Sequence, residues 1–283
     1  MKTLIIFPLI LSLFVGVFPA PATAGAAERK LPYYLEENKS RYETYQTANP
    51  DMPFDIVVAY VNSGVDKAYY SDIEIVKNPF DVRILVNKNI ALPSGYAPND
   101  LVTLPGGMLR AEAAAAFTEM RAAAADAGLS LVIRSSYRSH WDQVASYDLV
   151  MGNYGREAAE ISVARPGHSE HQLGLALDIV DREGTSGPLT VLGFDESREY
   201  FWLLEHGFEY GFILRYPRGY TDIQGFVYEP WHWRYVGVKI ASIMHYRGIT
   251  TFEEYYGKYL APAVLNKIQQ RRVPRPSLHM AER

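Results

Sequence analysis

The sequence contains no cysteine. This absence excludes disulfide bonds and thiolate zinc ligands, so the fold must rely on its apolar core. Basic residues are also few, with 28 lysines and arginines against 32 aspartates and glutamates. Non-specific binding to nucleic acid needs clustered positive charge, and it is therefore not expected. The apolar run Leu4–Phe18 is shorter than the roughly 20 residues that a membrane-spanning helix needs, and it contains Pro8.

The start of the chain has the pattern of a secretory signal peptide. Lys2 precedes the apolar run, and the small residues Ala22-Thr23-Ala24 follow it. We therefore expect residues 1–24 to be a signal peptide and the protein to be exported from the cytoplasm. An uncleaved membrane anchor is the alternative interpretation of the same pattern.

The remaining chain divides into three parts by composition. We expect an N-terminal tether and wrapping arm at 25–80, a catalytic domain at 81–260 and a basic, proline-containing tail at 261–283. Strands and helices follow one another without a repeating βαβ order, which favours an α+β fold with a small antiparallel sheet and flanking helices. The expected helices are 33–46, 107–127, 141–151, 156–161, 195–206 and 236–246, and the expected strands are 54–60, 81–87, 129–134, 173–180, 208–216 and 227–236.

Three segments contain the residue types of a catalytic zinc site: 134–139, 169–178 and 229–235. His171, Asp178 and His232 supply three ligands, which leaves the fourth position of a tetrahedral zinc open for water or substrate. Glu229 precedes the last ligand by three residues, so it can take a proton from water and return it to a leaving amine. Arg138 offers a fixed positive charge with donors suited to a carboxylate or an oxyanion.

Alternation along residues 173–180 places the metal on one face of the sheet. Leu173, Leu175, Leu177 and Ile179 fall on one side of the strand, and Gly174, Ala176 and Asp178 fall on the other. The leucine side is typical of a core. The small residues beside Asp178 predict an open face on which a metal and a substrate can lie.

Other interpretations of these residues are weaker. The remaining histidines are expected to be structural, and His168 is expected to be exposed on a turn made by Pro166-Gly167. The segment Gly167–His171 lacks the final glycine of a serine nucleophile elbow, and no S-x-x-K motif occurs. A protein that binds a metal or wall peptides without catalysis remains the competing hypothesis, against which Glu229 and Arg138 together argue.

At these motifs the chain resembles the VanY-type zinc D-alanyl-D-alanine carboxypeptidases, within the lysostaphin, D-Ala-D-Ala and hedgehog-like metallopeptidase group. The family pattern S-x-H-x-x-G-x-A-x-D is present at 169–178, and E-x-W-H is present at 229–232. The pattern S-x-Y-R-S-x-x-x-Q ends at Gln143. The resemblance covers residues 80–250.

The resemblance implies one Zn²⁺ per chain and a substrate among peptidoglycan stem peptides, from which the terminal D-alanine is trimmed. It assigns the zinc ligands to His171, Asp178 and His232, the general base to Glu229, an oxyanion or substrate contact to Arg138, and peptide contacts to Gln143 and Ser169. It places the protein at the cell wall and implies no partner protein. An L,D-carboxypeptidase or an endopeptidase is the alternative within the enzyme class.

Overall fold

The computed structural model describes residues 31–181, 193–261, 263 and 266. The predicted signal peptide at 1–24 and nearly all of the predicted tail at 261–283 lie outside the described residues. Within the described part of the chain, no helix is both long enough and apolar enough to cross a membrane.

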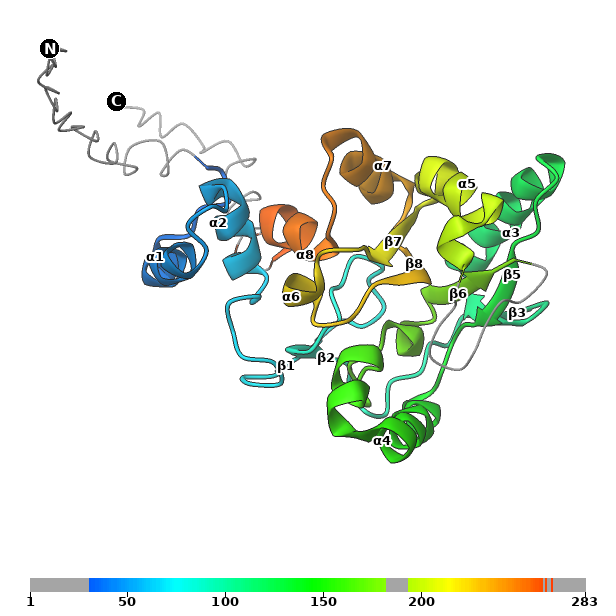
Figure 1. The fold of residues 1–283 in the computed structure, drawn as a ribbon, viewed down its shortest axis with the longest axis horizontal. Coiled ribbons are helices and arrows are strands. Elements are labelled where there is room, and N and C mark those ends of the chain that lie inside the picture. Colours follow the sequence, from blue (N-terminus) through cyan, green and yellow to red (C-terminus); the bar gives the residue numbers. More distant parts are fainter. Residues whose placement is uncertain (1–30, 182–192, 262, 264–265, 267–283) are drawn as a thin grey trace, which may run out of the picture.

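A four-stranded antiparallel sheet forms the centre of the molecule (Figure 1). Its strands lie in the order β5-β6-β8-β7. Their bounds are Val132–Ser135 for β5, Ala176–Val180 for β6, Phe212–Tyr216 for β7 and Glu229–Tyr235 for β8. This sheet and the helices around it confirm the predicted α+β fold.

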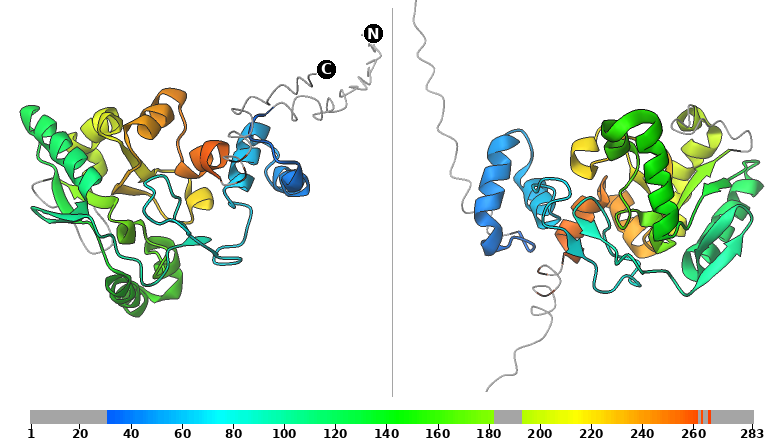
Figure 2. Two further views of the ribbon diagram at one scale, coloured as in Figure 1. Left: turned by 180° about the vertical axis from the view of Figure 1, so that it is seen from behind. Right: turned by 90° about the horizontal axis from the view of Figure 1, so that it is seen from below.

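One face of the sheet carries the main hydrophobic core. Leu177 and Ile179 of β6 and Trp233 of β8 belong to one buried cluster with Phe117 and Leu203. Phe117 lies on α3 (Ala111–Asp126) and Leu203 on α5 (Arg198–His206), so these two helices cover that face. Helix α4 lies on the other side of the sheet, as the views from the front and from below show (Figures 1 and 2). The predicted alternation along β6 is therefore confirmed.

The helix expected at 107–127 begins four residues late because a hairpin precedes it. Strands β3 (Leu101–Leu104) and β4 (Gly107–Arg110) pair around a turn made by Pro105 and Gly106. Gly106 has φ +101°, a conformation that glycine adopts without steric cost. Helix α3 therefore starts only where the hairpin ends.

Helix α4 (His140–Ser162) combines the two helical segments expected at 141–151 and 156–161. Ser139 begins it with a capping box, in which the serine and Asp142 each satisfy the other's backbone N–H. Gly155 has φ 85° and breaks the helix into its two parts. The helices expected at 195–206 and 236–246 are confirmed as α5 and α7 (Val238–Arg247).

The prediction of a strand at 54–60 is wrong, because this segment is the helix α2 (Phe54–Asn62). Five consecutive residues of α2 are buried because other helices pack against it. These are α1 (Lys39–Ala48), α8 (Phe252–Tyr255) and the π-helical turn η7 (Tyr256–Leu260). A short apolar run buried all round shows no period that distinguishes a strand from a helix. The single helix predicted at 33–46 is instead the 3₁₀ turn η3 (Glu36–Asn38) followed directly by α1, so the helical segment begins and ends later than predicted.

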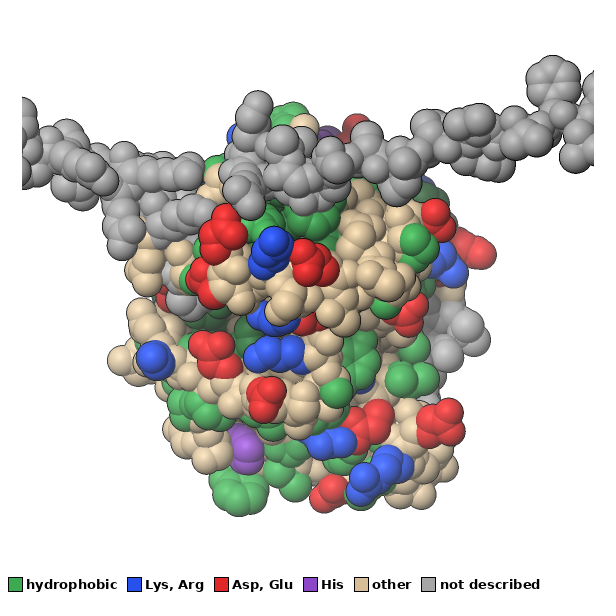
Figure 3. Space-filling view, turned by 90° about the vertical axis from the view of Figure 1, so that its left-hand side faces the viewer, with side chains coloured by type: hydrophobic (Ala, Val, Ile, Leu, Met, Phe, Trp, Pro, Cys, Tyr) green, Lys and Arg blue, Asp and Glu red, His purple; other side chains and the backbone are tan. Residues whose placement is uncertain are grey.

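Helices α1, α2 and α8 form one end of the molecule (Figure 1). A hydrophobic cluster that includes Tyr34, Tyr42, Val57 and Ala261 holds this end together. Figure 3 views the molecule from the same end, where acidic and basic side chains are interspersed.

The strand expected at 81–87 is also wrong. The short parallel pair β1 (Glu74–Ile75) and β2 (Ile90–Ala91) flanks this segment without including it. The carbonyl oxygens of Val82 and Ile84 instead accept hydrogen bonds from Nη2 of Arg234, each at 3.0 Å. A side chain from β8 therefore holds the segment that was expected to pair with another strand.

Lys88 anchors the segment between β1 and β2 to the rest of the molecule. Its side chain is buried, and its Nζ donates a hydrogen bond to the carbonyl of Glu160 on α4 at 2.7 Å. The ammonium also lies 4.5 Å from the ring centre of Tyr69 and 4.9 Å from that of Phe226. Burial lowers the pKa of Lys88 to about 8.

The remaining elements are short. Helix α6 (Thr221–Gln224) lies between β7 and β8. The 3₁₀ turns are η4 (Glu170–Leu173), η5 (Phe194–Glu196) and η6 (Gly207–Tyr210). Because η4 occupies the start of the strand expected at 173–180, β6 begins only at Ala176.

Candidate metal centre

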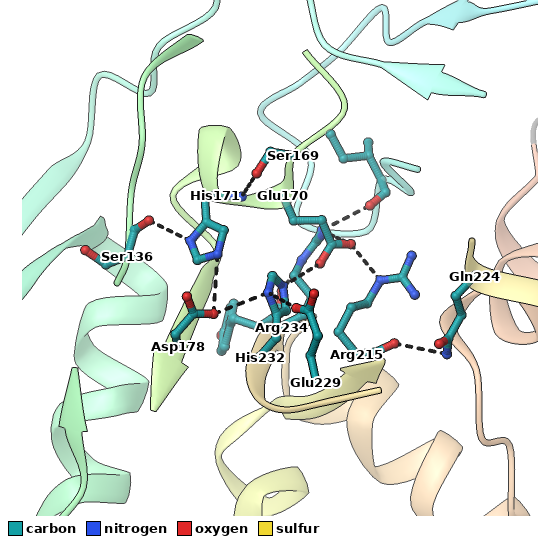
Figure 4. Close-up of polar contacts among 12 residues, drawn as sticks. Ser136, Ser169, Glu170, His171, Asp178, Arg215, Gln224, Glu229, His232 and Arg234 are labelled. Carbon is teal, nitrogen blue, oxygen red and sulfur yellow. Dashed lines mark hydrogen bonds and ion pairs between the residues drawn. The ribbon is translucent and has the colours of Figure 1, made fainter. Parts of the chain in front are cut away.

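Two strands and one turn bring the three predicted metal ligands together (Figure 4). Asp178 on β6 pairs directly with His232 on β8, so both side chains leave the same face of the sheet. His171 lies on η4, just before β6, and Ser169 begins that turn by accepting a hydrogen bond from the His171 N–H. The two imidazole rings are 4.9 Å apart and nearly perpendicular.

Hydrogen-bond partners determine which nitrogen of each ring faces Asp178. Nδ1 of His171 bonds to the carbonyl oxygen of Ser136 at 2.7 Å, which leaves Nε2 at 3.4 Å from Asp178 Oδ1. His232 is turned the other way: its Nε2 faces Glu170 Oε2 at 3.5 Å, and its Nδ1 is 3.4 Å from Asp178 Oδ1. Partners of this kind fix the ring orientation of metal-binding histidines.

The geometry of these three atoms fits zinc. A tetrahedral zinc with nitrogen and oxygen ligands at about 2.0–2.1 Å places its ligands roughly 3.3 Å apart. The two distances of 3.4 Å to Asp178 match this value, and all three ligand atoms lie within 4.8 Å of one another. Asp178 Oδ1 is buried and has no hydrogen-bond partner among the described residues. Such an atom is costly to bury without a ligand, so the residues present fit the ion.

The protonation of the two histidines differs. Burial and the nearby charge of Arg138 lower the pKa of His171 to about 4, so this ring is neutral at pH 7, as a metal ligand must be. Burial also acts to lower the pKa of His232, but the carboxylates of Asp178 and Glu170 raise it to about 9. A metal would therefore displace a proton from His232 at neutral pH.

Glu229 stands beside the ligands at the start of β8. Its Oε2 is 3.6 Å from Nδ1 of His232, and its side chain is buried. Burial raises the pKa of the Glu229 carboxyl to about 7, against the opposing charges of His232 and Arg138. A carboxyl group with this pKa can both accept and donate a proton near neutral pH.

Arg138 follows β5 and reaches the same site. Its backbone N–H donates to the carbonyl of His171 at 3.2 Å. Its Nε is buried and has no hydrogen-bond partner among the described residues. Burial lowers the pKa of Arg138, whereas the carboxylates of Asp178 and Glu229 favour its charged form. The guanidinium is thus a cation with unused donor capacity next to the metal ligands.

These residues lie in a cavity of about 290 Å³. One wall comes from α4 and the chain after it, and the other from the segment leading into β8. Apolar side chains line both walls, whereas the polar part includes the predicted metal ligands, Glu229, Arg138 and Ser169. The apolar residues include Leu149, Val150, Val163, Phe226, Val227 and Trp231.

Comparison with known proteins identifies the family. The model of the family described as VanY, D-alanyl-D-alanine carboxypeptidase, matches residues 106–238. The putative carboxypeptidase YodJ of Bacillus subtilis is 37% identical over 210 residues, which cover 69% of this chain and 76% of YodJ. The chain belongs to the VanY carboxypeptidase family.

Two proteins of solved structure that resemble this chain are named for different activities. The L,D-carboxypeptidase LdcB superimposes with a TM-score of 0.61 at 38% identity, over 66% of this chain and 91% of LdcB. A vancomycin-resistance D,D-pentapeptidase VanY variant, solved in complex with Zn(II), superimposes with a TM-score of 0.54 at 34% identity. That match covers 62% of this chain and 98% of the other.

The two substrate contacts expected from the VanY resemblance lie in different surroundings. Ser169 lines the cavity. Gln143 is fully buried on α4, and its Nε2 donates to the carbonyl of Ala164 at 2.7 Å. Because Ala164 lines the cavity and Gln143 does not, Gln143 supports the wall from behind. Direct contact between Gln143 and a substrate stays a prediction.

His168 corrects an expectation from the sequence. It is buried, not exposed, and its Nδ1 bonds to the carbonyl oxygen of Asn87 at 2.8 Å. Its ring also packs edge-on against Tyr70 at 5.0 Å. His168 is therefore covered by two residues that precede it far along the chain, Tyr70 and Asn87, and does not face solvent.

Glu170 is a site residue that the sequence reasoning missed. It lies between Ser169 and His171 in the VanY motif, is completely buried and faces His232. Burial opposes its ionisation, but the charges of Arg234 and Arg215 hold the pKa of the Glu170 carboxyl far below its usual range. The sequence did contain one sign of this role: Glu170 is a charged residue within a stretch that otherwise consists of apolar residues and predicted site residues.

Proposed function

We propose that this protein is a zinc-dependent carboxypeptidase that removes the terminal D-alanine from peptidoglycan stem peptides. The observation that carries the proposal is the set His171, Asp178 and His232 at zinc-ligand spacing, with Glu229 beside it. A zinc ion bound there would supply Lewis-acid chemistry, polarising the scissile carbonyl and lowering the pKa of a water molecule.

Glu229 performs the proton transfers in this proposal. Its carboxylate accepts a proton from the attacking water and then gives it to the leaving amine. Burial in the cavity raises the pKa of the Glu229 carboxyl to about 7, so it can change its protonation state near neutral pH. Asp178 cannot take this role, because it lies between the two histidines as a ligand.

Arg138 binds negative charge on the substrate. Its buried Nε and its neighbours Asp178 and Glu229 place it where either a terminal carboxylate or a developing oxyanion would lie. A planar guanidinium can hold either group with paired hydrogen bonds. The apolar walls at Leu149 and Phe226 would then contact the upstream part of the stem peptide.

An L,D-carboxypeptidase activity is the second candidate, favoured by the similarity to LdcB. Both activities need the same metal, base and cation, and they differ in the residue that precedes the released D-alanine. We further propose that the protein acts outside the cytoplasm at the cell wall, for which the sequence of residues 1–24 is the support.

Mass spectrometry of defined stem peptides tests the proposal. Zinc-loaded protein should release one D-alanine from a free pentapeptide, and an amidated carboxyl end should block release. Trimming of tetrapeptide but not of pentapeptide would assign the L,D activity. Equal cleavage of amidated or cross-linked stems would identify an endopeptidase. Binding of stem peptides without any cleavage would favour a non-catalytic module.

A further inference from the structure

A line of buried charged side chains leads from the metal centre to helix α8. It begins at His232, passes through Glu170 and Arg215, and ends at Glu253 (Figure 4 shows the first three). The side chains of Glu170, Arg215 and Glu253 are fully inaccessible to solvent. Arg234, also inaccessible, joins the line at Glu170.

We propose that Glu253 is a positioning residue for the metal centre, which acts through Arg215 and Glu170 to hold the His232 ring with its Nδ1 toward Asp178. The proposal rests on the zinc site described under the proposed function. It assigns a role in the reaction to α8, an element that contributes no residue to the wall of the cavity.

The two oxygens of Glu170 have different partners. Oε1 accepts hydrogen bonds from Nε of Arg215 and from Nη1 of Arg234, both at 2.8 Å. Oε2 has no hydrogen-bond partner among the described residues and faces Nε2 of His232 at 3.5 Å. Because the two arginines fix the carboxylate through Oε1, the direction of Oε2 is fixed as well. A carboxylate facing Nε2 favours a proton on that nitrogen and leaves Nδ1 free as a ligand.

Arg215 needs Glu253 to hold this position. Its Nη1 and Nη2 donate to the two oxygens of Glu253 at 3.0 and 2.6 Å, a paired arrangement that fixes the plane of the guanidinium. Its Nε is then directed at Glu170. Without Glu253, Arg215 would retain two unpaired buried donors and could turn away from Glu170 to satisfy them.

The energetic cost of such a network supports a positioning role. Removing four ionic groups from water is expensive, and buried ion pairs often add nothing to stability compared with apolar residues of the same volume. The four groups Glu170, Arg215, Arg234 and Glu253 balance in charge and fix each other's geometry. Orientation of a metal ligand is a function that apolar residues could not replace.

The adjacent residue Glu254 provides a matched control. It lies on the same helix and is also buried, but it pairs with Lys258 at 2.8 Å, away from Arg215. Substitution of either glutamate by glutamine removes one buried charge from α8. Only Glu253→Gln should affect the metal centre.

The test measures zinc affinity of the full chain by competition with a chelator. It also measures the His232 tautomer of the metal-free protein by ¹⁵N NMR at a pH well above 9, where the imidazole is neutral. Loss of a carboxylate partner of a metal ligand typically weakens metal binding about 10- to 100-fold. We expect Glu170→Gln to fall in this range and Glu253→Gln to cost up to about tenfold. Both should shift the tautomer away from Nε2–H, whereas Glu254→Gln should change neither quantity.

The double variant separates positioning from a general structural role. If Glu253 acts through Glu170, adding Glu253→Gln to Glu170→Gln should weaken zinc binding no further. Additive losses would overturn the proposal, and so would wild-type affinity and tautomer in Glu253→Gln. Arg215→Lys serves the same test if Glu253→Gln does not fold. If neither variant folds, the network is needed for folding and the positioning role is overturned.

The two proposals fail in different ways. Wild-type protein that binds no zinc would contradict the proposed function. Wild-type protein that binds zinc, with affinity unaffected by Glu253→Gln, would contradict only the inference about Glu253.

Discussion

Asp178 lies directly opposite His232 on the neighbouring strand, with 3.4 Å between Asp178 Oδ1 and His232 Nδ1. This pairing connects two parts of the sequence that are far apart, and it places the carboxylate where it can share a metal with both histidines. Three ligands hold a catalytic zinc, and two hold it far less tightly.

Removal of His232 should therefore abolish zinc binding at micromolar metal. We expect purified wild-type protein to contain one zinc per chain, to lose activity with a chelator and to regain it with added zinc. His232→Ala should bind little zinc in elemental analysis. His206→Ala, which alters a histidine on α5 outside the cavity, is the control and should retain the metal. Activity that survives chelation would contradict the metal site.

Glu229→Gln should retain the fold and the zinc but lose turnover. Glutamine has nearly the same shape as glutamate and cannot accept the proton of the attacking water. General acid–base assistance is typically worth about 10²–10⁴ in rate, so kcat should fall by this factor. Steady-state kinetics with a pentapeptide, together with zinc analysis of the same sample, checks this. A variant with most of its kcat would refute the assigned role.

Arg138→Lys should lower kcat/KM for the free pentapeptide by about 10- to 100-fold, because a hydrogen bond to a charged group contributes about 1.5–3 kcal/mol. Lysine keeps the charge but loses the paired donors. An effect mainly on KM would indicate contact with the terminal carboxylate, and an effect mainly on kcat would indicate contact with the oxyanion. Unchanged kinetics would show that charge alone suffices there.

Gly257→Ala should destabilise the protein by about 1–3 kcal/mol. A Cβ at this position would overlap the backbone of Ala59, so η7 could no longer approach α2. Gly152→Ala is the matched control, since a Cβ there meets no atom within 4 Å and Gly152 lies inside α4. It should be neutral or stabilising by up to about 1 kcal/mol. Urea unfolding of both variants measures the difference.

Lys88 should make stability depend on pH in the alkaline range. Its pKa in the folded protein is about 8, below the ordinary 10.5, so folding disfavours its charged form. The charged form of Lys88 therefore lowers the free energy of unfolding most below pH 8. This penalty is relieved as the pH rises from 8 toward 10.5, because the folded protein loses the proton first. Relative to Lys88→Met, the wild type should gain about 1–3 kcal/mol of unfolding free energy over this interval. A constant difference between the two proteins would show that Lys88 does not carry the shifted pKa.

The sequence was sufficient to predict the sheet and the residues that meet at the candidate metal centre, because strong local patterns encode them. Alternation along β6 distinguishes the face of Asp178 from that of Leu177, and both faces are as predicted. The kink of α4 was visible as a gap between two helical segments around Gly155. In each case, the residues that determine the feature are neighbours in sequence.

The features that the sequence did not reveal depend on distant contacts. Helix α2 reads as a strand because its apolar run is short, and its helical form is stabilised by α1 and α8. Glu170 gains its importance from Arg215 and Arg234, which lie 45 and 64 residues away. The buried position of His168 likewise depends on the distant Asn87.

The chain enters and leaves the described domain through a single hydrophobic cluster. Tyr33 near its start and Ala261 near its end both belong to this cluster, which lies at the end formed by α1, α2 and α8. No described residue between 31 and 62 lines the cavity. Attachment of the molecule through either end, to a bead, a membrane or a fused domain, would therefore hold it at this cluster. The cavity would stay accessible. For the same reason, a short linker between the two ends should permit a circularly permuted protein with an intact metal centre.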